Sequence, residues 1–520
     1  MKFIYFFYFL FTSFIVLGQN KFSKNEELRK IYTFEYDRLS DSLLPYLNSN
    51  NNSYKYMAIK SMASVQDTSI APILSKILLD EKIDTFKLAL IYSLSQLDCY
   101  FSFNTLMNYY SNCPIPNIKY TCLAAIGKIA KKDLTDFYIH AFNKRLKSNT
   151  DYITNWLKGV YLAKRNKQID LEKNKQHMIQ ILDSIVDHNL GKSNEVNYYY
   201  SKLVTKNKEV NANDVKTTPK NKQEIDEQIK LHKSPYQKLN TLTKYNLTEQ
   251  LCKEFIFSNE HALLKSYALD YLLLNHTDKI PIDEELIQSI FDLMDVALIS
   301  RICEYILEQK KQNKNVAVSV DILQNTQRQL FLPRDFETWI DLEKAILSFE
   351  GKIYQYKSCF ETGYNNPIDW KYIVNIAANQ KVKITTNKGN MILLLHVNDA
   401  PGSVANYLKL VDQGYYNGKY FHRMVPNFVV QGGCPRGDGW GSLEWNQRSE
   451  LSGNQIYKKG SVGLASVGKD SEGVQFFISH TFAPHLEGRY TIFADVIDGL
   501  AVIENLMVGD QIISIERLMN

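Results

Sequence analysis

Long apolar runs are almost absent from this chain of 520 residues. The one exception is the stretch at residues 3–17. Beyond it, no segment approaches the roughly 20 consecutive apolar residues that a membrane-spanning helix needs. We therefore expect no membrane span once this first run has been removed.

Signatures of metal sites and of covalent catalysis are missing too. No cysteine or histidine pair has the spacing of metal ligands, and no nucleophile motif is apparent. The glycine cluster at residues 437–441 lacks the Lys-Ser/Thr pair that follows a phosphate-binding loop, so we interpret it as turn sequence. The sequence therefore implies no metal and no cofactor.

The cysteines do not form the pattern of a disulfide framework. There are seven, an odd number at irregular spacing, and most fall in helical apolar patterns. A chain of this length can bury a sufficient core without disulfides. We expect mainly free thiols, with Cys113 and Cys122 as the one pairing left open, and Cys434 as a small buried residue rather than a redox group.

A strong excess of one charge is also lacking. Lys and Arg number 61 and Asp and Glu number 56, a net charge of +5. Residues 381–520 contain 13 basic and 13 acidic residues, so the excess is spread over the 380 residues before them. Such a thin excess is not the footprint of a nucleic-acid-binding protein, and we expect no nucleic-acid partner.

The chain does contain the pattern of an export signal. Met1-Lys2 is followed by the apolar run of about fifteen residues, which ends at the small residue Gly18. Residues 1–18 are therefore predicted to be a signal peptide cut before Gln19, with an uncleaved anchor as the alternative. No cysteine at the cleavage zone supports a lipoprotein. The mature protein is predicted to be exported and periplasmic or associated with the cell envelope.

Residues 19–329 show repeated amphipathic helices. Three similar segments start at Ala58, Ala89 and Ala124, 31 and 35 residues apart, and each closes on an aspartate. Helix pairs with this spacing bury their apolar faces by stacking on one another. The segments resemble degenerate HEAT repeats, which implies an all-α helical-repeat solenoid with a surface for a protein partner.

Two stretches interrupt this pattern. Residues 205–233 are polar and almost free of aromatics, which predicts a linker within the helical region. From 330 to 380 the apolar residues lose their period, which predicts a connector with Trp339 and Trp370 as anchors.

The most informative pattern lies at residues 418–432, which contain Arg423, Phe428 and Gln431. The even spacing of Arg423 and Gln431 places both side chains on one face if the segment is a single strand. Strands are predicted at 382–385 and 391–396, and Asp399-Ala400-Pro401 is typical of a helix start. Segments 460–466, 474–478 and 484–493 then follow in order.

In this order the segments resemble the cyclophilins, which are peptidyl-prolyl cis/trans isomerases, over residues 381–520. The resemblance implies a closed β-barrel with flanking helices, so the whole chain is predicted to be multidomain, with the barrel following the helical repeats. It also implies an apolar pocket for a proline ring. By resemblance the catalytic residues are Arg423, Gln431 and Phe428, and the substrate-binding residues are Val429, Ala465, Ser466, Phe477, His485, Leu486 and Tyr490.

These residues suit the chemistry of the Xaa-Pro bond. Its rotation barrier is about 18–20 kcal/mol, and the twisted transition state localises a lone pair on the prolyl nitrogen. A guanidinium such as Arg423 donates to that nitrogen more strongly in the transition state than in either planar state. The amide of Gln431 is expected to hold the substrate carbonyl. His485 replaces the tryptophan that helps to bind cyclosporin, and Tyr490 stands where a histidine is common, so the resemblance does not predict sensitivity to the drug.

Two functional classes remain open. The first is an exported folding catalyst that acts on proline-containing client polypeptides and uses its repeats to hold a client or partner. The second is a non-catalytic scaffold that docks proline-containing loops. The presence of Arg423, Phe428 and Gln431 favours the first, and the fusion of such repeats to a cyclophilin domain is typical of Bacteroidota.

Overall fold

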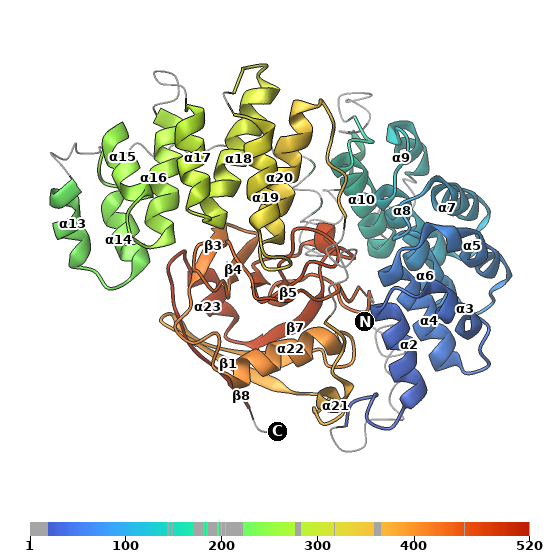
Figure 1. Ribbon diagram of the computed structural model, residues 1–520. Coiled ribbons are helices and arrows are strands. Elements are labelled where there is room, and N and C mark those ends of the chain that lie inside the picture. Colours follow the sequence, from blue (N-terminus) through green and yellow to red (C-terminus); the bar gives the residue numbers. More distant parts are fainter. Residues whose placement is uncertain are drawn as a thin grey trace.

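The structure is a computed structural model that describes residues 19–142, 146, 149–170, 222–275, 282–316, 318–357, 366–451 and 453–518, with isolated residues between 178 and 203. The predictions for residues 1–18, for 205–221 and for Cys359 lie outside these residues. Figure 1 shows two groups of helices, coloured blue to teal and green to yellow, on two sides of a sheet domain in orange and red.

The first helical group contains the three repeated segments, which are helical as predicted. They begin in α4 (Asn52–Val65), α6 (Asp84–Leu94) and α8 (Pro116–Lys128) and run past the ends of these helices. The three helices pack on one another in that order, and α10 (Thr150–Arg165) continues on α8. The remaining elements are α2 (Glu26–Tyr36), α3 (Ser40–Leu47), η2 (Thr68–Ile70), α5 (Ala71–Asp80), α7 (Tyr100–Asn112) and α9 (Thr135–Ala141).

Local sequence explains how these helices start and how closely they pack. The side chain of Asn51 caps α4 by accepting hydrogen bonds from the amides of Ser53 and Tyr54 at 2.9 and 3.3 Å. Glycines allow α8 and α10 to approach, since a Cβ on Gly127 would lie 2.1 Å from the carbonyl oxygen of Gly159.

The second helical group has its own apolar core. It contains α13 (Lys222–Lys230), α14 (Pro235–Leu242), α15 (Glu249–Ile256), α16 (Ala262–Asn275), α17 (Glu284–Asp292), α18 (Val296–Lys311), α19 (Val320–Gln329) and α20 (Phe336–Phe349).

Two helices of this group lie where the sequence predicted irregular chain. α13 occupies the end of the predicted linker, because Ile225 and Ile229 are one turn apart and both buried. α20 lies in the predicted connector and packs on α18 and α19. Trp339 contacts two apolar clusters, and the indole N–H of Trp370 donates to Oγ1 of Thr33 at 2.9 Å.

The sheet domain is a curled antiparallel sheet of eight strands in the order β3-β4-β6-β5-β7-β2-β1-β8. The strands are β1 (Lys381–Thr386), β2 (Gly389–Leu395), β3 (Phe421–Val425), β4 (Val429–Gly432), β5 (Ser461–Leu464), β6 (Phe476–Ser479), β7 (Ile492–Asp498) and β8 (Ile512–Arg517). The helices are α21 (Trp370–Ile373), α22 (Pro401–Asp412), η5 (Pro484–Leu486) and α23 (Leu500–Asn505).

The two edges of this sheet meet only in part, which qualifies the prediction of a closed barrel. β3 and β8 are not paired as strands. Instead, Gly418 N–H donates to the Ile512 carbonyl at 2.8 Å, and Ile512 N–H donates to the Lys419 carbonyl at 2.7 Å. The contact between the edges is therefore limited to the short stretch around these residues.

The first helical group and the sheet domain share one apolar core. A single cluster of buried side chains runs from α2–α10 into the interior of the sheet. The guanidinium of Arg38 pairs with the buried carboxylate of Asp470 and donates to the carbonyl of Ser449 at 2.7 Å. The ring of Phe22, which is fully buried, packs on Tyr32 and on Trp370. The two parts therefore form one packed body.

Two further predictions concern the described part of the chain. Its six cysteines, Cys113 and Cys122 among them, are free thiols. None of the helices in the described residues combines the length and the apolar character that a bilayer crossing requires.

Candidate active site

Arg423 and Gln431 lie on two strands and not on one. The chain turns after β3 at Pro426 and Asn427, where Asn427 has a φ of +55°, and returns as β4. The prediction of a single strand is therefore wrong. Both side chains nevertheless reach the same face, because Arg423 and Gln431 are direct partners in the antiparallel register. Nη1 of Arg423 donates a long hydrogen bond of 3.5 Å to Oε1 of Gln431.

Nine of the ten predicted site residues line one cavity of about 460 Å³. Its apolar walls belong to a cluster that is separate from the main core and includes Val429, Phe477 and Leu486. The rings of Phe477 and Tyr490 meet edge to face at 5.8 Å. The nine residues are Arg423, Phe428, Val429, Gln431, Ala465, Ser466, Phe477, Leu486 and Tyr490.

His485, the tenth predicted residue, supports the cavity from outside. Its ring stacks on Phe428 with the centroids 5.2 Å apart. Its Nδ1 lies 3.3 Å from the hydroxyl of Tyr161 on α10. One wall of the cavity is thus connected through His485 to the first helical group.

Gln475, which the sequence analysis did not single out, fixes the polar side of the cavity. Its Nε2 donates to the carbonyls of Gly439 and Gly441 at 2.8 and 3.1 Å. Its Oε1 accepts a hydrogen bond of 3.0 Å from Nε2 of Gln431. The amide of Gln431 carries two N–H groups, so this contact orients it and leaves the second N–H for a substrate carbonyl.

Five other lining residues were also missed: Glu337, His422, Asp438, Gly439 and Trp440. Burial, assisted by the charge of Arg423, lowers the pKa of His422 to about 4, so this imidazole is neutral near pH 7. Arg423 is therefore the one cationic side chain among the residues that line this cavity.

The glycine-rich loop at 437–441 is held by the second helical group. Nη2 of Arg436 lies 2.8 Å from carboxylate oxygens of both Asp438 and Asp295, the residue that caps α18. The hydroxyl of Tyr236 donates to the carbonyl of Gly437. Cys434 at the base of this loop is buried, which raises the pKa of its thiol to about 11 and leaves it protonated, as expected for a small structural residue.

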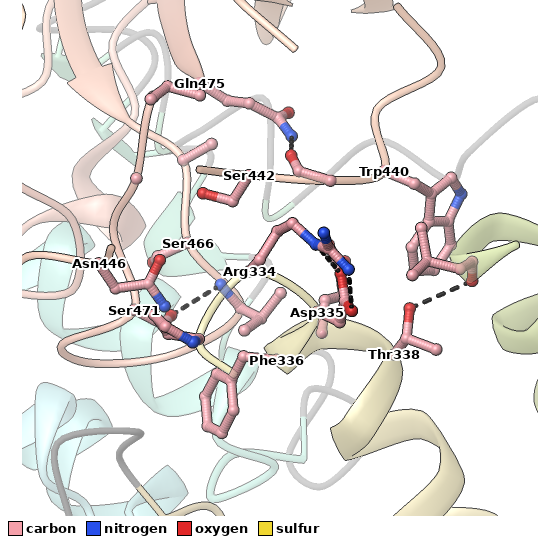
Figure 2. A pocket seen from close by; sticks show the side chains of 18 of the residues that line it. Arg334, Asp335, Phe336, Thr338, Trp440, Ser442, Asn446, Ser466, Ser471 and Gln475 are labelled. Atoms are coloured by element: carbon pink, nitrogen blue, oxygen red, sulfur yellow. Dashed lines mark hydrogen bonds and ion pairs between the residues drawn. The ribbon is translucent and has the colours of Figure 1, made fainter. Parts of the chain in front are cut away.

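A second, polar cavity of about 130 Å³ adjoins the first (Figure 2). It lies between residues 333–338 of the second helical group and the sheet domain. Together the cavities form a site with an apolar pocket, the guanidinium of Arg423 at its rim and a polar extension. Such a site can bury a ring and hold the polypeptide on either side of it.

Known proteins resemble the sheet domain. Residues 381–514 match the family described as cyclophilin type peptidyl-prolyl cis-trans isomerase/CLD. A peptidyl-prolyl cis-trans isomerase of Helicobacter pylori (strain ATCC 700392 / 26695) is 42% identical over 135 residues, which cover 25% of this chain and 83% of the relative. Peptidyl-prolyl cis-trans isomerase B of Bacillus subtilis (strain 168) is 44% identical over 117 residues, 22% of this chain and 82% of the relative. A solved cyclophilin type isomerase from Cryptosporidium parvum is 31% identical with a TM-score of 0.26, and the match covers 27% of this chain and 98% of that one.

The region of similarity contains the β3–β4 hairpin and all the residues that line the apolar cavity except Glu337. Two bacterial relatives exceed 40% identity over more than four fifths of their own length. The chain therefore belongs to the cyclophilin-type peptidyl-prolyl cis-trans isomerase family, the enzymes of class EC 5.2.1.8.

Proposed function

We propose that this protein is an exported peptidyl-prolyl isomerase that uses Arg423 to accelerate the rotation of Xaa-Pro bonds in client polypeptides. The observation that carries the proposal is the meeting of Arg423 and Gln431 at the rim of the apolar cavity. A proline ring buried against Phe428, Phe477 and Leu486 would present its nitrogen to the guanidinium and its neighbouring carbonyl to the Gln431 amide.

Catalysis in this scheme comes from binding the twisted bond better than either planar form. The lone pair of the prolyl nitrogen is delocalised in the planar states and accepts a hydrogen bond only when the bond is twisted. A donor fixed before the reaction spends little energy on reorganisation, which is why preorganised groups are effective. Arg423 suits this role because its guanidinium is charged at every physiological pH.

The helical region is proposed as a surface that holds a client or a partner protein. The succession of α4, α6, α8 and α10 supports a HEAT-like stack. Large apolar side chains are exposed on this group, among them Leu79, Tyr100 and Phe101 at 69%, 67% and 50%. Export to the periplasm or cell envelope is supported by the basic start and the apolar run before Gly18. The assignment to Bacteroidota stays a prediction.

The test is proline-limited peptide isomerisation by residues 19–520, with and without Arg423→Ala. We expect kcat/KM to fall at least tenfold, a loss of about 1.4 kcal/mol of transition-state stabilisation. Arg328→Ala is the matched control, because Arg328 is exposed on α19 and, within the described residues, its side chain bonds to Asn325 alone. Unchanged kcat/KM in Arg423→Ala would reject the arginine mechanism. If the folded wild type showed no activity, the alternative function, a non-catalytic scaffold that docks proline-containing loops, would be favoured.

A further inference from the structure

The second helical group contributes directly to the substrate cavities. Glu337, the second residue of α20, lines the apolar cavity and the adjoining polar cavity. Figure 2 shows Arg334, Asp335 and Phe336 on the helical side of the polar cavity, with Ser466 and Gln475 on the sheet side. Glu337 therefore lies where the two cavities meet, about 90 residues in sequence from the hairpin that carries Arg423.

The walls of the polar cavity contain one carboxylate without an ion-pair partner among the described residues. Arg334 and Asp335 neutralise each other through two hydrogen bonds of 2.8 Å. Glu337 makes no hydrogen bond or ion pair with any residue that the structure describes. The nearby Asp341 and Glu304 add negative potential, which Lys344 opposes in part.

Two hydroxyl groups in the same cavity also lack partners. The Oγ atoms of Ser442 and Ser466 are buried and have no hydrogen-bond partner among the described residues. Buried polar groups in native proteins are nearly always paired, so these two hydroxyls are available to a molecule bound in the cavity. Each hydroxyl oxygen can accept a hydrogen bond from an N–H donor.

We propose that Glu337 and the polar cavity bind the cationic side chain of a lysine or arginine near the client proline. The helical region then takes part in substrate selection at the isomerase site itself. An ammonium or guanidinium group would give Glu337 the partner that it lacks and would donate to the two serine hydroxyls. An acidic side chain in the same place would meet a like charge in a partly buried setting.

The selected residue must lie close to the proline in sequence. The two cavities share Gln431, Gly439, Trp440, Ala465, Ser466 and Glu337. An extended chain advances about 3.3–3.6 Å per residue, so neighbouring cavities are filled by residues within about three positions of one another. This inference rests on the proposed isomerase function, because it treats the apolar cavity as the proline pocket.

The test compares proline peptides that carry one lysine with otherwise identical peptides that carry Nε-acetyl-lysine. The lysine is placed in turn at each of the three positions before and after the proline. The proteins are residues 19–520 as the wild type, Glu337→Gln, Glu337→Lys and the control Glu350→Gln. Glu350 lies exposed at the other end of α20 and pairs with Lys352.

We expect the wild type to prefer lysine over acetyl-lysine by at least fivefold in kcat/KM at one or two positions. The preference should fall below twofold in Glu337→Gln, reverse in Glu337→Lys and persist in Glu350→Gln. Equal preference in the wild type and Glu337→Gln would overturn the inference while leaving the isomerase activity intact.

Binding of the same peptides by calorimetry separates this inference from the proposed function. If the folded wild type turned over no peptide, the proposed function would fail. Cation selection would then be judged by affinity alone. A lysine preference that Glu337→Gln abolishes would support selection, and equal affinities for both peptides would reject it.

Discussion

At the residue scale, the site depends on a chain of polar contacts that starts at the guanidinium. Arg423 contacts Gln431, Gln431 contacts Gln475, and Gln475 is anchored on two carbonyls of the glycine-rich loop. A side chain whose partners are all fixed loses little freedom when substrate binds, so Gln475 acts as a positioning residue for Gln431.

Replacing Gln475 by Met tests this role. The substitution keeps a similar volume but removes the acceptor that orients Gln431 and the donor to Gly439. The loss of one neutral hydrogen bond, about 1 kcal/mol, would lower kcat roughly fivefold if Gln431 acts in the transition state. KM should change little, and Gln413→Met, at an exposed residue after α22, should leave both constants unchanged. A change in thermal stability without a change in kcat would show that Gln475 is only structural.

The sequence predicted most residues of this site because they belong to continuous motifs. Nine predicted residues line one cavity, and the tenth stacks on it. Gln475 was missed although it lies within the predicted segment 474–478, because a single amide among apolar residues has no pattern of its own. Glu337 was missed because only the tertiary structure places α20 against the sheet domain.

At the element scale, two predictions were wrong: the single strand at 418–432 and the irregular connector over the residues of α20. The apolar residues on both sides of Pro426-Asn427 suggested one strand, although a proline followed by an asparagine with positive φ is typical of a turn. The helix α20 has an amphipathic pattern with buried Ile340, Leu342 and Ile346, but this pattern occupies only the 14 residues Phe336–Phe349 of the longer stretch that was predicted to be a connector. A short amphipathic segment is easily overlooked when the chain on both sides of it has no regular period.

The first turn of α20 also gives the protein a predicted response to pH. Burial is the main cause that raises the pKa of Glu337 to about 7, followed by the negative charge of Asp341. Below this pH the carboxyl group is neutral, and above it the group is charged. The peptide lysine stays charged throughout, since its pKa is about 10.4. The preference for lysine should therefore grow as the pH rises from 6 to 8.

The other charged groups around Glu337 do not remove this expectation. They are Asp341 and Lys344 on α20, Glu304 on α18, Asp438 in the loop, and His422 and Arg423 in the cavity. His422, with its pKa near 4, stays neutral over the range. The measurement is the lysine to acetyl-lysine ratio of kcat/KM at pH 6, 7 and 8 in the wild type and in Glu337→Gln. A slope that persists in Glu337→Gln would assign the effect to another group.

At the scale of the whole molecule, the first helical group and the sheet domain form one packed body. The sequence analysis divided them because their patterns differ. The structure joins them through one apolar core and through the Arg38–Asp470 pair. Isolated residues 381–520 would lose the ion pair of Asp470 with Arg38 and the hydrogen bond of 3.2 Å from the Arg448 amide to the Tyr36 hydroxyl. A low activity of that fragment could therefore result from poor folding as well as from loss of client selection.

The substitution Arg38→Ala tests this coupling in the intact chain. Both side chains of the pair are nearly buried, with 12% and 6% of their surface exposed. Burial alone would raise the pKa of Asp470, but Arg38 and, to a smaller extent, Lys469 hold it below its usual value, so removing the guanidinium takes away the main counter-ion of a buried carboxylate. Breaking a buried pair from one side costs about 3–5 kcal/mol. We expect a loss of this order in the free energy of unfolding measured in denaturant.

Hydrogen exchange measures which helices and strands are destabilised by the substitution Arg38→Ala. Because one core spans both parts, Arg38→Ala should speed exchange in α2, α4 and α6 and, to a similar extent, in β5 and β7 of the sheet domain. Arg301→Ala, which removes the partner of Asp270 in the second helical group, should affect mainly α16 and α18. Faster exchange confined to the helices in Arg38→Ala would show that the sheet domain is stable by itself. Exchange that rises in both parts together would mean that a change in the first helical group reaches the wall of the active site.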